Sequence, residues 1–389
     1  PVNGVSGVAM SFYTTWEQTS WDDTRLQLYS KNAADVETAL SKKHLNTDDF
    51  MALLSPAAEP YLPLMAERSQ QLTRQRFGNT LHLFIPLYLS NLCANDCSYC
   101  GFSMSNRLKR KTLSPAEIEQ ECQAIKAKGF DTLLIVTGEH EAKVGIDYFR
   151  QALPIVKRYF SYVMFEVQPL ATHEYAELRT LGLDAVMVYQ ETYQAATYAK
   201  HHLKGKKRDF RWRLETPDRL GECGIDKIGL GSLIGLEDWR IDSTFTAMHL
   251  DYLRRRYWRS RYSLSFPRLR PCAGGVDNAK TISDKQLVQL ICAYRLRFPD
   301  VELSLSTREQ QALRDGLFRL GVTSVSAESK TQPGGYANEQ QELEQFSIDD
   351  DRSVSEVAQA IRAKGLQPVW QDWLNELSAM PPETFSSPE

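Results

Sequence analysis

The chain has 389 residues, of which 42% are hydrophobic and 24% charged, and its formal net charge is −3. This composition is typical of a globular protein with a substantial core, large enough for one α/β barrel or two ordinary domains. It disfavours a strongly basic nucleic-acid-binding chain, and no apolar run approaches the length of a membrane-spanning helix. We therefore expect a cytoplasmic protein that keeps its thiols reduced, with neither nucleic acid nor membrane as a partner.

The first part of the chain predicts helices and no chemistry. Residues 1–10 lack periodicity and resemble an expression scar. Residues 11–78 are expected to form an N-terminal helical extension, because helix formers dominate stretches such as 33–40 and Thr47 can cap the stretch that follows it. Pro56, Pro60 and Pro63 should interrupt these helices.

From residue 82 onward, short apolar runs of strand length alternate with amphipathic stretches of helical length. The predicted strands cover residues 82–89, 132–136, 162–167, 184–189, 227–230, 262–266, 301–305 and 322–325. The predicted helices cover residues 114–128, 144–160, 173–181, 237–258, 284–297 and 308–320. Eight strands that alternate with helices predict a parallel (β/α)8 barrel over residues 79–335, followed by a C-terminal cap and tail over residues 336–389.

Three of the seven cysteines, Cys93, Cys97 and Cys100, lie within eight residues directly after the first predicted strand. Three thiolates at this spacing are one ligand short of closing the site around a four-iron cluster, so one iron would stay open. Structural zinc is one alternative, but it usually needs a second short pair of Cys or His ligands, which the sequence lacks. A disulfide framework is another, and the odd number of cysteines in a long chain disfavours it.

Almost every predicted strand ends in polar residues or glycine. These ends are Thr137-Gly138-Glu139-His140, Glu166-Val167-Gln168-Pro169, Tyr189-Gln190-Glu191-Thr192, Gly229-Leu230-Gly231, Pro267-Arg268-Leu269-Arg270-Pro271, Ser306-Thr307-Arg308-Glu309 and Ser326-Ala327-Glu328-Ser329. Because barrel enzymes carry their chemistry at the carboxyl ends of the strands, the ends predict one large polar pocket at that mouth. Arg268 and Arg270 alternate around Leu269, so both should face the pocket and favour a carboxylate on the substrate. His201 and His202 are expected in a loop.

The C-x3-C-x2-C spacing, with Tyr99 before the last cysteine, resembles the radical S-adenosylmethionine (SAM) superfamily. The resemblance implies that Cys93, Cys97 and Cys100 hold a [4Fe-4S] cluster whose open iron binds SAM. It also implies that Tyr99 packs beside the cluster and does no chemistry itself.

The resemblance further implies a set of SAM-binding residues at the strand ends. Gly138 and Glu139 should meet the SAM amino group, Glu191 should lie near the ribose, and Arg213 should bind the carboxylate. Taken singly, each of these residues could equally belong to an ordinary turn or a surface ion pair. Gln168 and Tyr189 complete the expected set of cofactor-binding residues.

Several longer stretches resemble one family within the superfamily, the tyrosine lyases of bacterial thiamine biosynthesis. The stretches are 92–103, 227–231, 266–271, 305–309 and 331–336. The resemblance implies that a 5′-deoxyadenosyl radical takes hydrogen from the amino group of L-tyrosine, after which the Cα–Cβ bond breaks to give 2-iminoacetate (dehydroglycine) and p-cresol. It implies that Arg270, with Arg268, binds the substrate carboxylate, and that Ser306 and Arg308 are further catalytic candidates. It also implies two partners, a flavodoxin-type reductant and the thiazole synthase subunit.

Other activities stay open on the sequence. The related tyrosine lyase of hydrogenase maturation carries a second cluster on C-terminal cysteines, whereas no cysteine follows Cys292 here. A tryptophan lyase of the same branch is a closer alternative. An iron–sulfur electron carrier would explain the cysteines but not the polar strand ends. A radical SAM enzyme acting on tRNA would explain the basic runs 107–111, 204–208 and 254–261, but no RNA-binding module is recognisable, and a solvated helix face is the favoured interpretation of the last run.

Overall fold

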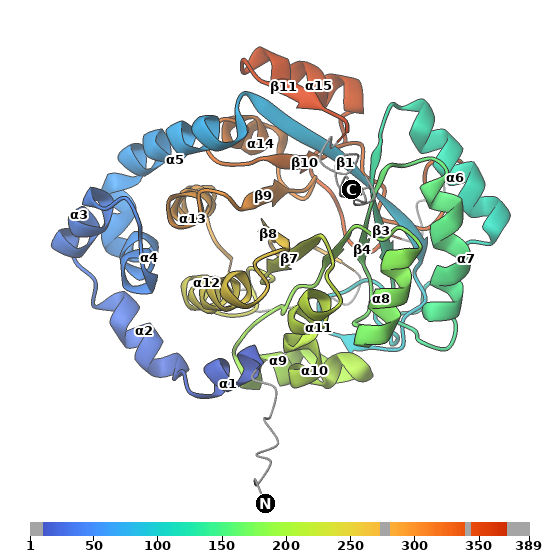
Figure 1. The fold of residues 1–389 in the computed structure, drawn as a ribbon, viewed down its shortest axis with the longest axis horizontal. Coiled ribbons are helices and arrows are strands. Elements are labelled where there is room, and N and C mark those ends of the chain that lie inside the picture. The colour runs from blue at the N-terminus through green and yellow to red at the C-terminus, as the bar shows by residue number, and fades with distance from the viewer. Residues whose placement is uncertain (1–10, 273–280, 339–343, 372–389) are drawn as a thin grey trace, which may run out of the picture.

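Eight parallel strands close into a barrel in the computed structural model, which describes residues 11–272, 281–338 and 344–371. The strands are β1 (Thr80–Ser90), β3 (Thr132–Thr137), β4 (Tyr162–Glu166), β5 (Ala185–Met187), β7 (Lys227–Gly231), β8 (Arg261–Ser265), β9 (Glu302–Leu305) and β10 (Ser324–Ser326). Each pairs in parallel with the next, and β10 pairs with β1 through His82 and Ser324, which closes the ring (Figure 1). The predicted (β/α)8 barrel is thus confirmed.

Helices surround the barrel and bury its outer face (Figure 1). They are α6 (Pro115–Ala127), α7 (Ile146–Lys157), α8 (Thr172–Thr180), α9 (Ala195–His201), α10 (Phe210–Leu214), α11 (Thr216–Glu222), α12 (Trp239–Arg256), α13 (Asp284–Arg297) and α14 (Gln311–Leu317), with a short 3-10 turn, η2 (Lys206–Arg208). Helix α6 begins where the sequence predicts, because Ser114 and Glu117 form a capping box and Pro115 opens the first turn. Among the described residues, no helix combines the length and the apolar character needed to cross a membrane.

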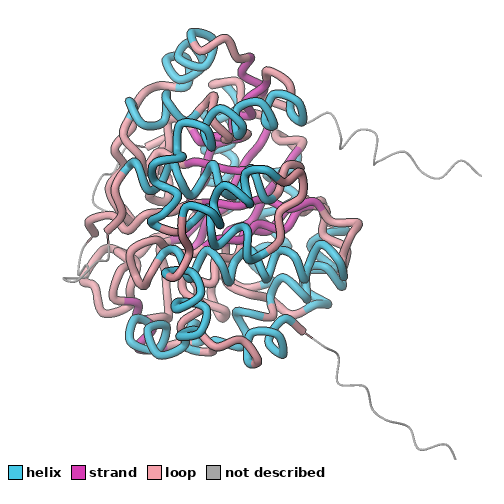
Figure 2. The backbone as a smooth tube through the Cα atoms, turned by 90° about the vertical axis from the view of Figure 1, so that its left-hand side faces the viewer, coloured by secondary structure: helices cyan, strands magenta, loops and turns pink. Residues whose placement is uncertain are grey.

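The alternation pattern missed a two-stranded antiparallel ribbon outside the barrel. Strand β2 (Asp96–Cys97) pairs with β6 (His202–Lys204), with Cys97 opposite His202. Figure 2 shows this ribbon at the lower left, away from the barrel strands. His202 therefore lies in a strand rather than in the expected loop. Segments of two or three residues carry no hydrophobic period, so the sequence pattern contains no signal for them.

Six N-terminal elements wrap one side of the barrel (Figure 1). They are α1 (Phe12–Glu17), α2 (Trp21–Tyr29), α3 (Ala33–Ser41), α4 (Thr47–Leu54), η1 (Pro56–Tyr61) and α5 (Leu62–Phe77). They are tied to the barrel helices by side chains that reach the end of α4: Arg240 Nε donates to Leu54 O at 2.8 Å and Gln289 Nε2 to Leu53 O at 2.9 Å. The expression scar predicted at residues 1–10 lies outside the described residues.

The C-terminal segment is anchored to the start of β1 and to α14. Helix α15 (Val354–Ala363) leads into β11 (Gln367–Val369), which pairs in parallel with the first residues of β1. Upstream, Asp350 forms a fully buried ion pair with Arg314 of α14, and it also accepts hydrogen bonds from Arg352. The predicted tail at residues 372–389 lies outside the described residues.

Replacing Asp350 with Ala should strongly destabilise the fold. The substitution leaves the Arg314 guanidinium buried without its counter-charge, which typically costs about 3–5 kcal/mol. We expect the free energy of unfolding, measured by urea titration, to fall by an amount in this range. Asp351→Ala changes an exposed neighbour and serves as the control, and equal losses in the two variants would contradict the ion-pair argument.

A buried carboxyl on α12 should make stability depend on pH. Asp242 accepts hydrogen bonds from Tyr193 N at 2.7 Å and Thr192 Oγ1 at 3.0 Å, both on one oxygen, and burial raises its pKa from 3.8 to about 8. Between these values the folded protein keeps a proton that the unfolded chain releases, so unfolding free energy should fall by about 1.4 kcal/mol per pH unit as pH rises. Asp242→Asn retains the accepting oxygen and removes this dependence. Its stability advantage over the natural chain in urea titrations should grow from pH about 5 to pH about 8, and a constant difference would refute the assignment.

Candidate functional site

The cysteine loop follows β1 at the carboxyl end of the barrel, and all three cysteines in it are free thiols. Backbone bonds fix the loop on its neighbours: Ala94 N donates to Glu139 O at 2.8 Å and Ser98 N to His201 O at 3.1 Å. The guanidinium of Arg110 reaches inward and donates to carbonyls of Asn91, Phe102, Ser103 and Asn106. The loop is therefore held in place by protein contacts alone.

The chemistry of these thiols suits a metal cluster. Burial raises the pKa of Cys93 to about 11 and that of Cys97 well above its ordinary value, so neither thiol ionises near neutral pH without added positive charge. Within the described residues, no group of three Cys, His, Asp or Glu side chains is arranged to hold a single metal ion. Cysteine thiolates are the ligands that [4Fe-4S] clusters use in proteins.

Four buried charges form a network beside the loop. Arg213 Nη1 lies 3.1 Å from Glu139 Oε1, its Nη2 lies 3.4 Å from Glu191 Oε1, and Lys207 Nζ lies 2.7 Å from the same Glu191 oxygen. The other oxygen of Glu139 accepts from Asn95 Nδ2 at 2.7 Å, which joins the network to the cysteine loop. The structure therefore brings together Glu139, Glu191 and Arg213, as the sequence predicted, and adds Lys207 to them.

Glu191 occupies a strained backbone position at the end of β5. Its φ is +70°, a left-handed conformation that is uncommon for residues other than glycine, and such strain is typical of functional sites. Burial opposes ionisation of its carboxyl, but Lys207 and Arg213 outweigh this effect and hold its pKa below the ordinary value. Glu191 is thus an anion whose remaining oxygen can accept hydrogen bonds from a ligand.

A cavity of about 250 Å³ opens against this network. Its lining includes Asn95, Glu139, Gln168, Trp212 and Arg213. Gln168 shapes the wall, because its amide donates to Val144 O at 2.9 Å and accepts from His140 N at 3.2 Å. At Gly138 a side chain would collide with Leu92 O and the Cys93 side chain, so only glycine lets the strand end approach the cysteine loop this closely.

Tyr99 is fixed by the ribbon behind the loop. Its hydroxyl lies 2.7 Å from His202 Nε2, and His202 Nδ1 lies 2.7 Å from Tyr198 O. Burial, with a smaller effect from Lys207, lowers the pKa of His202 to about 3, so the ring is neutral. A neutral ring that donates from Nδ1 accepts at Nε2, and Tyr99 is therefore the donor.

A second, narrow cavity of about 80 Å³ lies inside the barrel. Its lining includes Tyr88, Glu166, Tyr189, Ser306 and Arg308. Tyr189 links the two cavities, since its carbonyl accepts from Arg213 Nε at 2.6 Å and its hydroxyl donates to Ser265 Oγ at 3.1 Å. Burial raises the pKa of Glu166, and Arg308 opposes this rise only in part. The cavity thus holds a carboxyl that keeps its proton more readily than usual.

The three arginines expected to bind substrate have different surroundings. Arg268 and Arg270 follow the last residue of β8 by several positions, so the strand alternation does not extend to them. Arg268 is bound by Glu309 and Asp284, and Arg270 by Asp349. Neither lines the inner cavity, whereas Arg308 does, and it has no carboxylate partner among the described residues.

Unpaired polar atoms collect at the barrel mouth. Among the described residues, those that are buried without a hydrogen-bond partner include Thr137 Oγ1, Gln190 Nε2, Arg270 Nε, Ser329 Oγ and Gln332 Oε1, all at or just beyond the carboxyl ends of strands. Buried polar groups are normally paired, and although other unpaired atoms, such as those of Arg74, His249 and Arg295, lie elsewhere, these five can form hydrogen bonds with a polar ligand at this end of the barrel. The residues present therefore fit a polar cofactor.

The sequence did not single out three residues that the structure places here. Glu166 was visible only as one polar strand end among several. Lys207 lay in a basic run without any sign of burial, and Gln345 gave no signal. Gln345 Nε2 lies 3.6 Å from Cys100 Sγ, and its Oε1 accepts from Tyr88 OH at 2.8 Å.

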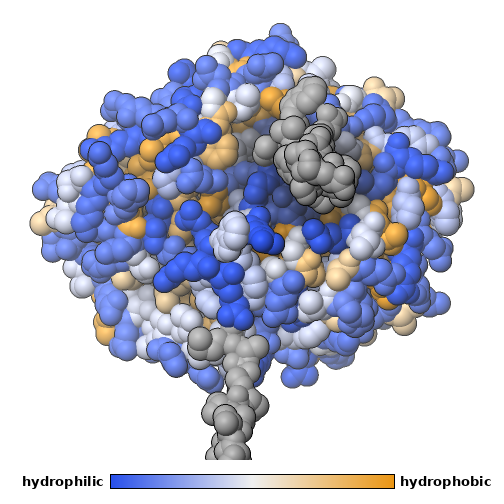
Figure 3. Space-filling model, in the orientation of Figure 1, coloured by the Kyte–Doolittle hydropathy of each residue, from blue (hydrophilic) through white to orange (hydrophobic). Residues whose placement is uncertain are grey.

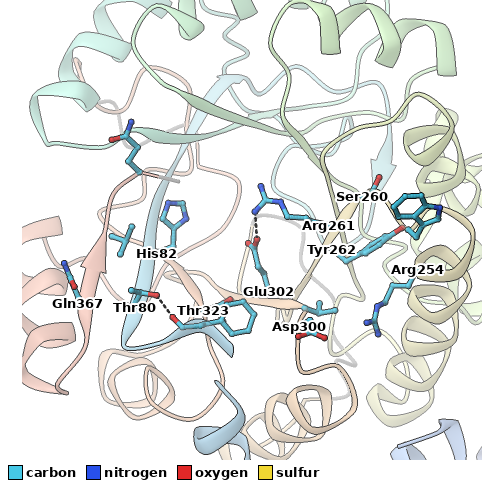
Figure 4. A pocket seen from close by; sticks show the side chains of 15 residues that line it. Thr80, His82, Arg254, Ser260, Arg261, Tyr262, Asp300, Glu302, Thr323 and Gln367 are labelled. Atoms are coloured by element: carbon cyan, nitrogen blue, oxygen red, sulfur yellow. Dashed lines mark hydrogen bonds and ion pairs between the residues drawn. The ribbon is translucent and has the colours of Figure 1, made fainter. Parts of the chain in front are cut away.

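A larger cavity of about 910 Å³ lies at the opposite end of the barrel. It is lined by residues at the beginnings of strands, such as Thr80, His82 and Arg261, and the Arg261–Glu302 ion pair crosses it (Figure 4). Figure 3 shows hydrophilic side chains around a recess on this face. Residues at this end of a barrel serve stability rather than catalysis, so we do not assign the reaction to this cavity.

Two family models match the chain. The radical SAM superfamily matches residues 87–247, which contain the cysteine loop and the charge network. The biotin and thiamin synthesis associated domain matches residues 265–367. The chain therefore uses the [4Fe-4S] cluster and SAM of this superfamily.

Individual proteins narrow the family further. The 2-iminoacetate synthases of Salmonella typhimurium and Escherichia coli are 63% and 64% identical over 364 residues, which cover 93% of this chain and 97% of each relative. The FeFe-hydrogenase maturase HydG from Carboxydothermus hydrogenoformans superimposes with a TM-score of 0.83 at 30% identity, covering 93% of this chain and 83% of that one. This chain is similar to the two synthases over nearly its whole length, including the cysteine loop and the barrel mouth. The chain therefore belongs to the radical SAM superfamily and, within it, to the 2-iminoacetate synthases.

Proposed function

We propose that this lyase takes L-tyrosine as its substrate and releases p-cresol together with 2-iminoacetate. The observation that best supports this substrate is the inner cavity, which combines aromatic and apolar walls with a guanidinium, Arg308, that has no carboxylate partner among the described residues. An aromatic amino acid has a ring that can pack on the aromatic and apolar walls and a carboxylate that can pair with the guanidinium. When bound, the cluster would supply the electron that splits SAM into methionine and the 5′-deoxyadenosyl radical, which would take hydrogen from the substrate amine. Cleavage of the Cα–Cβ bond would then leave 2-iminoacetate and a 4-hydroxybenzyl radical, and a second electron and a proton would convert this radical to p-cresol.

The cysteine loop and the charge network would hold the cofactors. We assign Cys93, Cys97 and Cys100 as cluster ligands. We assign Arg213 to the SAM carboxylate, which would share this guanidinium with Glu139 and Glu191, and Glu191 to the ribose hydroxyls, because it is an ionised acceptor. Gly138 and Glu139 would meet the SAM amino group, while Tyr99, Gln168 and Tyr189 shape the walls.

We assign the substrate carboxylate to Arg308 rather than to Arg270. Arg270 and Arg268 already bind Asp349 and Glu309, and a second carboxylate would have to compete with these ion pairs. Arg308 instead stacks on Phe346, with 3.5 Å between its guanidinium carbon and the ring centre. Both side chains line the cavity. Ser306 lines the same cavity and can donate a hydrogen bond to the carboxylate.

Glu166 is the group best suited to exchange a proton with the substrate phenol. It lines the inner cavity beside Tyr189, and its pKa is raised by burial. A carboxyl with a pKa moved toward neutrality works efficiently as a general acid or base.

Two partners follow from this chemistry. A one-electron reductant, of the flavodoxin type, must reduce the cluster. The imine product hydrolyses readily in water, so a thiazole synthase subunit would receive it directly for thiamine thiazole formation.

An anaerobic assay tests the substrate. The protein is reconstituted with iron and sulfide and given dithionite, SAM and tyrosine. We expect 5′-deoxyadenosine and p-cresol to form together and only when tyrosine is present. Deoxyadenosine without p-cresol would reject tyrosine, and the same assay with tryptophan would then test the alternative lyase.

Each cluster ligand should be indispensable. Cys93→Ala, Cys97→Ala and Cys100→Ala each remove one of only three thiolates, so we expect no detectable cleavage of SAM and a loss of the iron–sulfur absorption. Cys223 is a free thiol directly after the last residue of α11. Cys223→Ala is the matched control and should keep both signals. Full SAM cleavage by Cys100→Ala would refute the ligand set.

Arg308→Gln should weaken the use of tyrosine while the cluster is retained. A hydrogen bond to a charged group contributes about 1.5–3 kcal/mol, which corresponds to a loss of roughly 10- to 100-fold in kcat/KM for tyrosine. Arg308→Lys should recover part of this loss because it restores the charge. Arg270→Gln is the control. A larger loss of kcat/KM in that variant would show that Arg270, not Arg308, binds the substrate carboxylate.

A further inference from the structure

The cysteine loop has a second layer of chain directly behind it, residues 200–208. Strand β6 pairs with β2 along Asp96 and Cys97, and Lys207 N donates to Asn95 Oδ1 at 3.1 Å. At Gly205 a side chain would collide with Asn95 and Ala94 O, so this layer lies in close contact with the loop backbone. The outer face of the ribbon is thus the surface of the molecule that lies directly over the cysteine loop.

That surface combines exposed apolar and basic side chains. Leu203 on β6 is 50% exposed and Met104, whose N donates to Asn95 O at 2.9 Å, is 48% exposed. Large apolar side chains this exposed are few among the described residues, and two of them flank the same short stretch of the loop. We call this surface the ribbon face. It also carries exposed cations, namely Arg107, Lys109, Lys200, Lys204 and Arg208.

The cations of the ribbon face outnumber the carboxylates beside them in the described part of the chain, where only Lys204 has one opposite it, on Asp96. None of the five forms an ion pair there, although the whole chain carries a formal net charge of −3. Glu141 binds Lys206 and Asp209 caps α10, whereas Asp96 lies opposite Lys204 in the ribbon, accepts from Ser103 and Ser105, and has its pKa lowered by these hydrogen bonds and by the charge of Lys204. A small apolar centre with an unpaired basic rim fits a negatively charged protein surface.

We propose that the ribbon face is the docking surface for an acidic protein that carries one electron. The inference rests on the proposed function, which requires one electron at the cluster for each SAM that is cleaved. In the step itself the carrier is oxidised by one electron and the cluster is reduced by one. Electron transfer weakens steeply with distance, so the carrier must dock where the cluster loop lies just beneath the surface, and weak redox complexes are typically small.

The test is a charge reversal, Lys200→Glu with Arg208→Glu, read out by binding and by kinetics, because both side chains are exposed and neither lies opposite a carboxylate of the cysteine loop. Oxidised flavodoxin is the probe. We expect its Kd, measured by calorimetry, to rise about tenfold or more, and its affinity for the natural chain to fall as salt is raised. The rate of 5′-deoxyadenosine formation driven by reduced flavodoxin should fall similarly, whereas the rate driven by dithionite, a small reductant that needs no docking, should be unchanged.

Arg255→Glu with Arg259→Glu is the matched control. It reverses two exposed arginines, one in the last turn of α12 and one just after this helix, at the opposite end of the barrel, and should leave flavodoxin binding intact. Equal weakening in both pairs of variants, or a flavodoxin affinity of the natural chain that is independent of salt, would overturn the proposal. Inactivity of the natural chain with dithionite would instead reject the proposed function. Should the reversed variant lose its cluster, the salt dependence of the natural chain still decides.

Discussion

The site depends on the two ion pairs that Arg213 forms with Glu139 and Glu191. The guanidinium joins the end of β3 to the end of β5, and Glu139 extends the connection through Asn95 into the cysteine loop. Removing one member of such a network leaves a buried charge unpaired, which costs several kcal/mol. The charges are tolerated because every one has a partner. Lys207 offsets the second negative charge, so the four groups sum to zero before a ligand arrives.

The barrel could be predicted from the sequence because its signal is repeated. The eight predicted strands are short apolar runs, and six of them are followed by a stretch long enough to show a helical period, as in the stretch that Ser114 caps. The cysteine loop could be predicted because its ligands are adjacent in the chain. The ribbon of β2 and β6 could not, since its pairing joins residues about a hundred positions apart through strands of two and three residues.

The roles of the arginines show where sequence reasoning ends. Arg268, Arg270 and Arg308 all stand near strand ends, and nothing local distinguishes them. Whether an arginine is free to bind a ligand depends on carboxylates elsewhere: Glu309 comes 41 positions after Arg268, and Asp349 comes from the C-terminal segment. Pairing at such separations is a property of the folded chain. The role of Glu166 could not be predicted for the same reason, because burial in the folded chain raises its pKa.

The C-terminal segment gives the molecule an order of assembly. Gln345 contacts Cys100 and Tyr88 beside the site, and Asp350 and β11 anchor this segment to α14 and to the start of β1. Ribosomes make a chain from its N-terminus, so the cysteine loop is synthesised roughly 240 residues before the segment that covers it. During that interval the three thiols are open on the side of Gln345. In the finished barrel, Gln345 covers this side of Cys100, so the last part of the chain to be made completes the wall around the first functional loop.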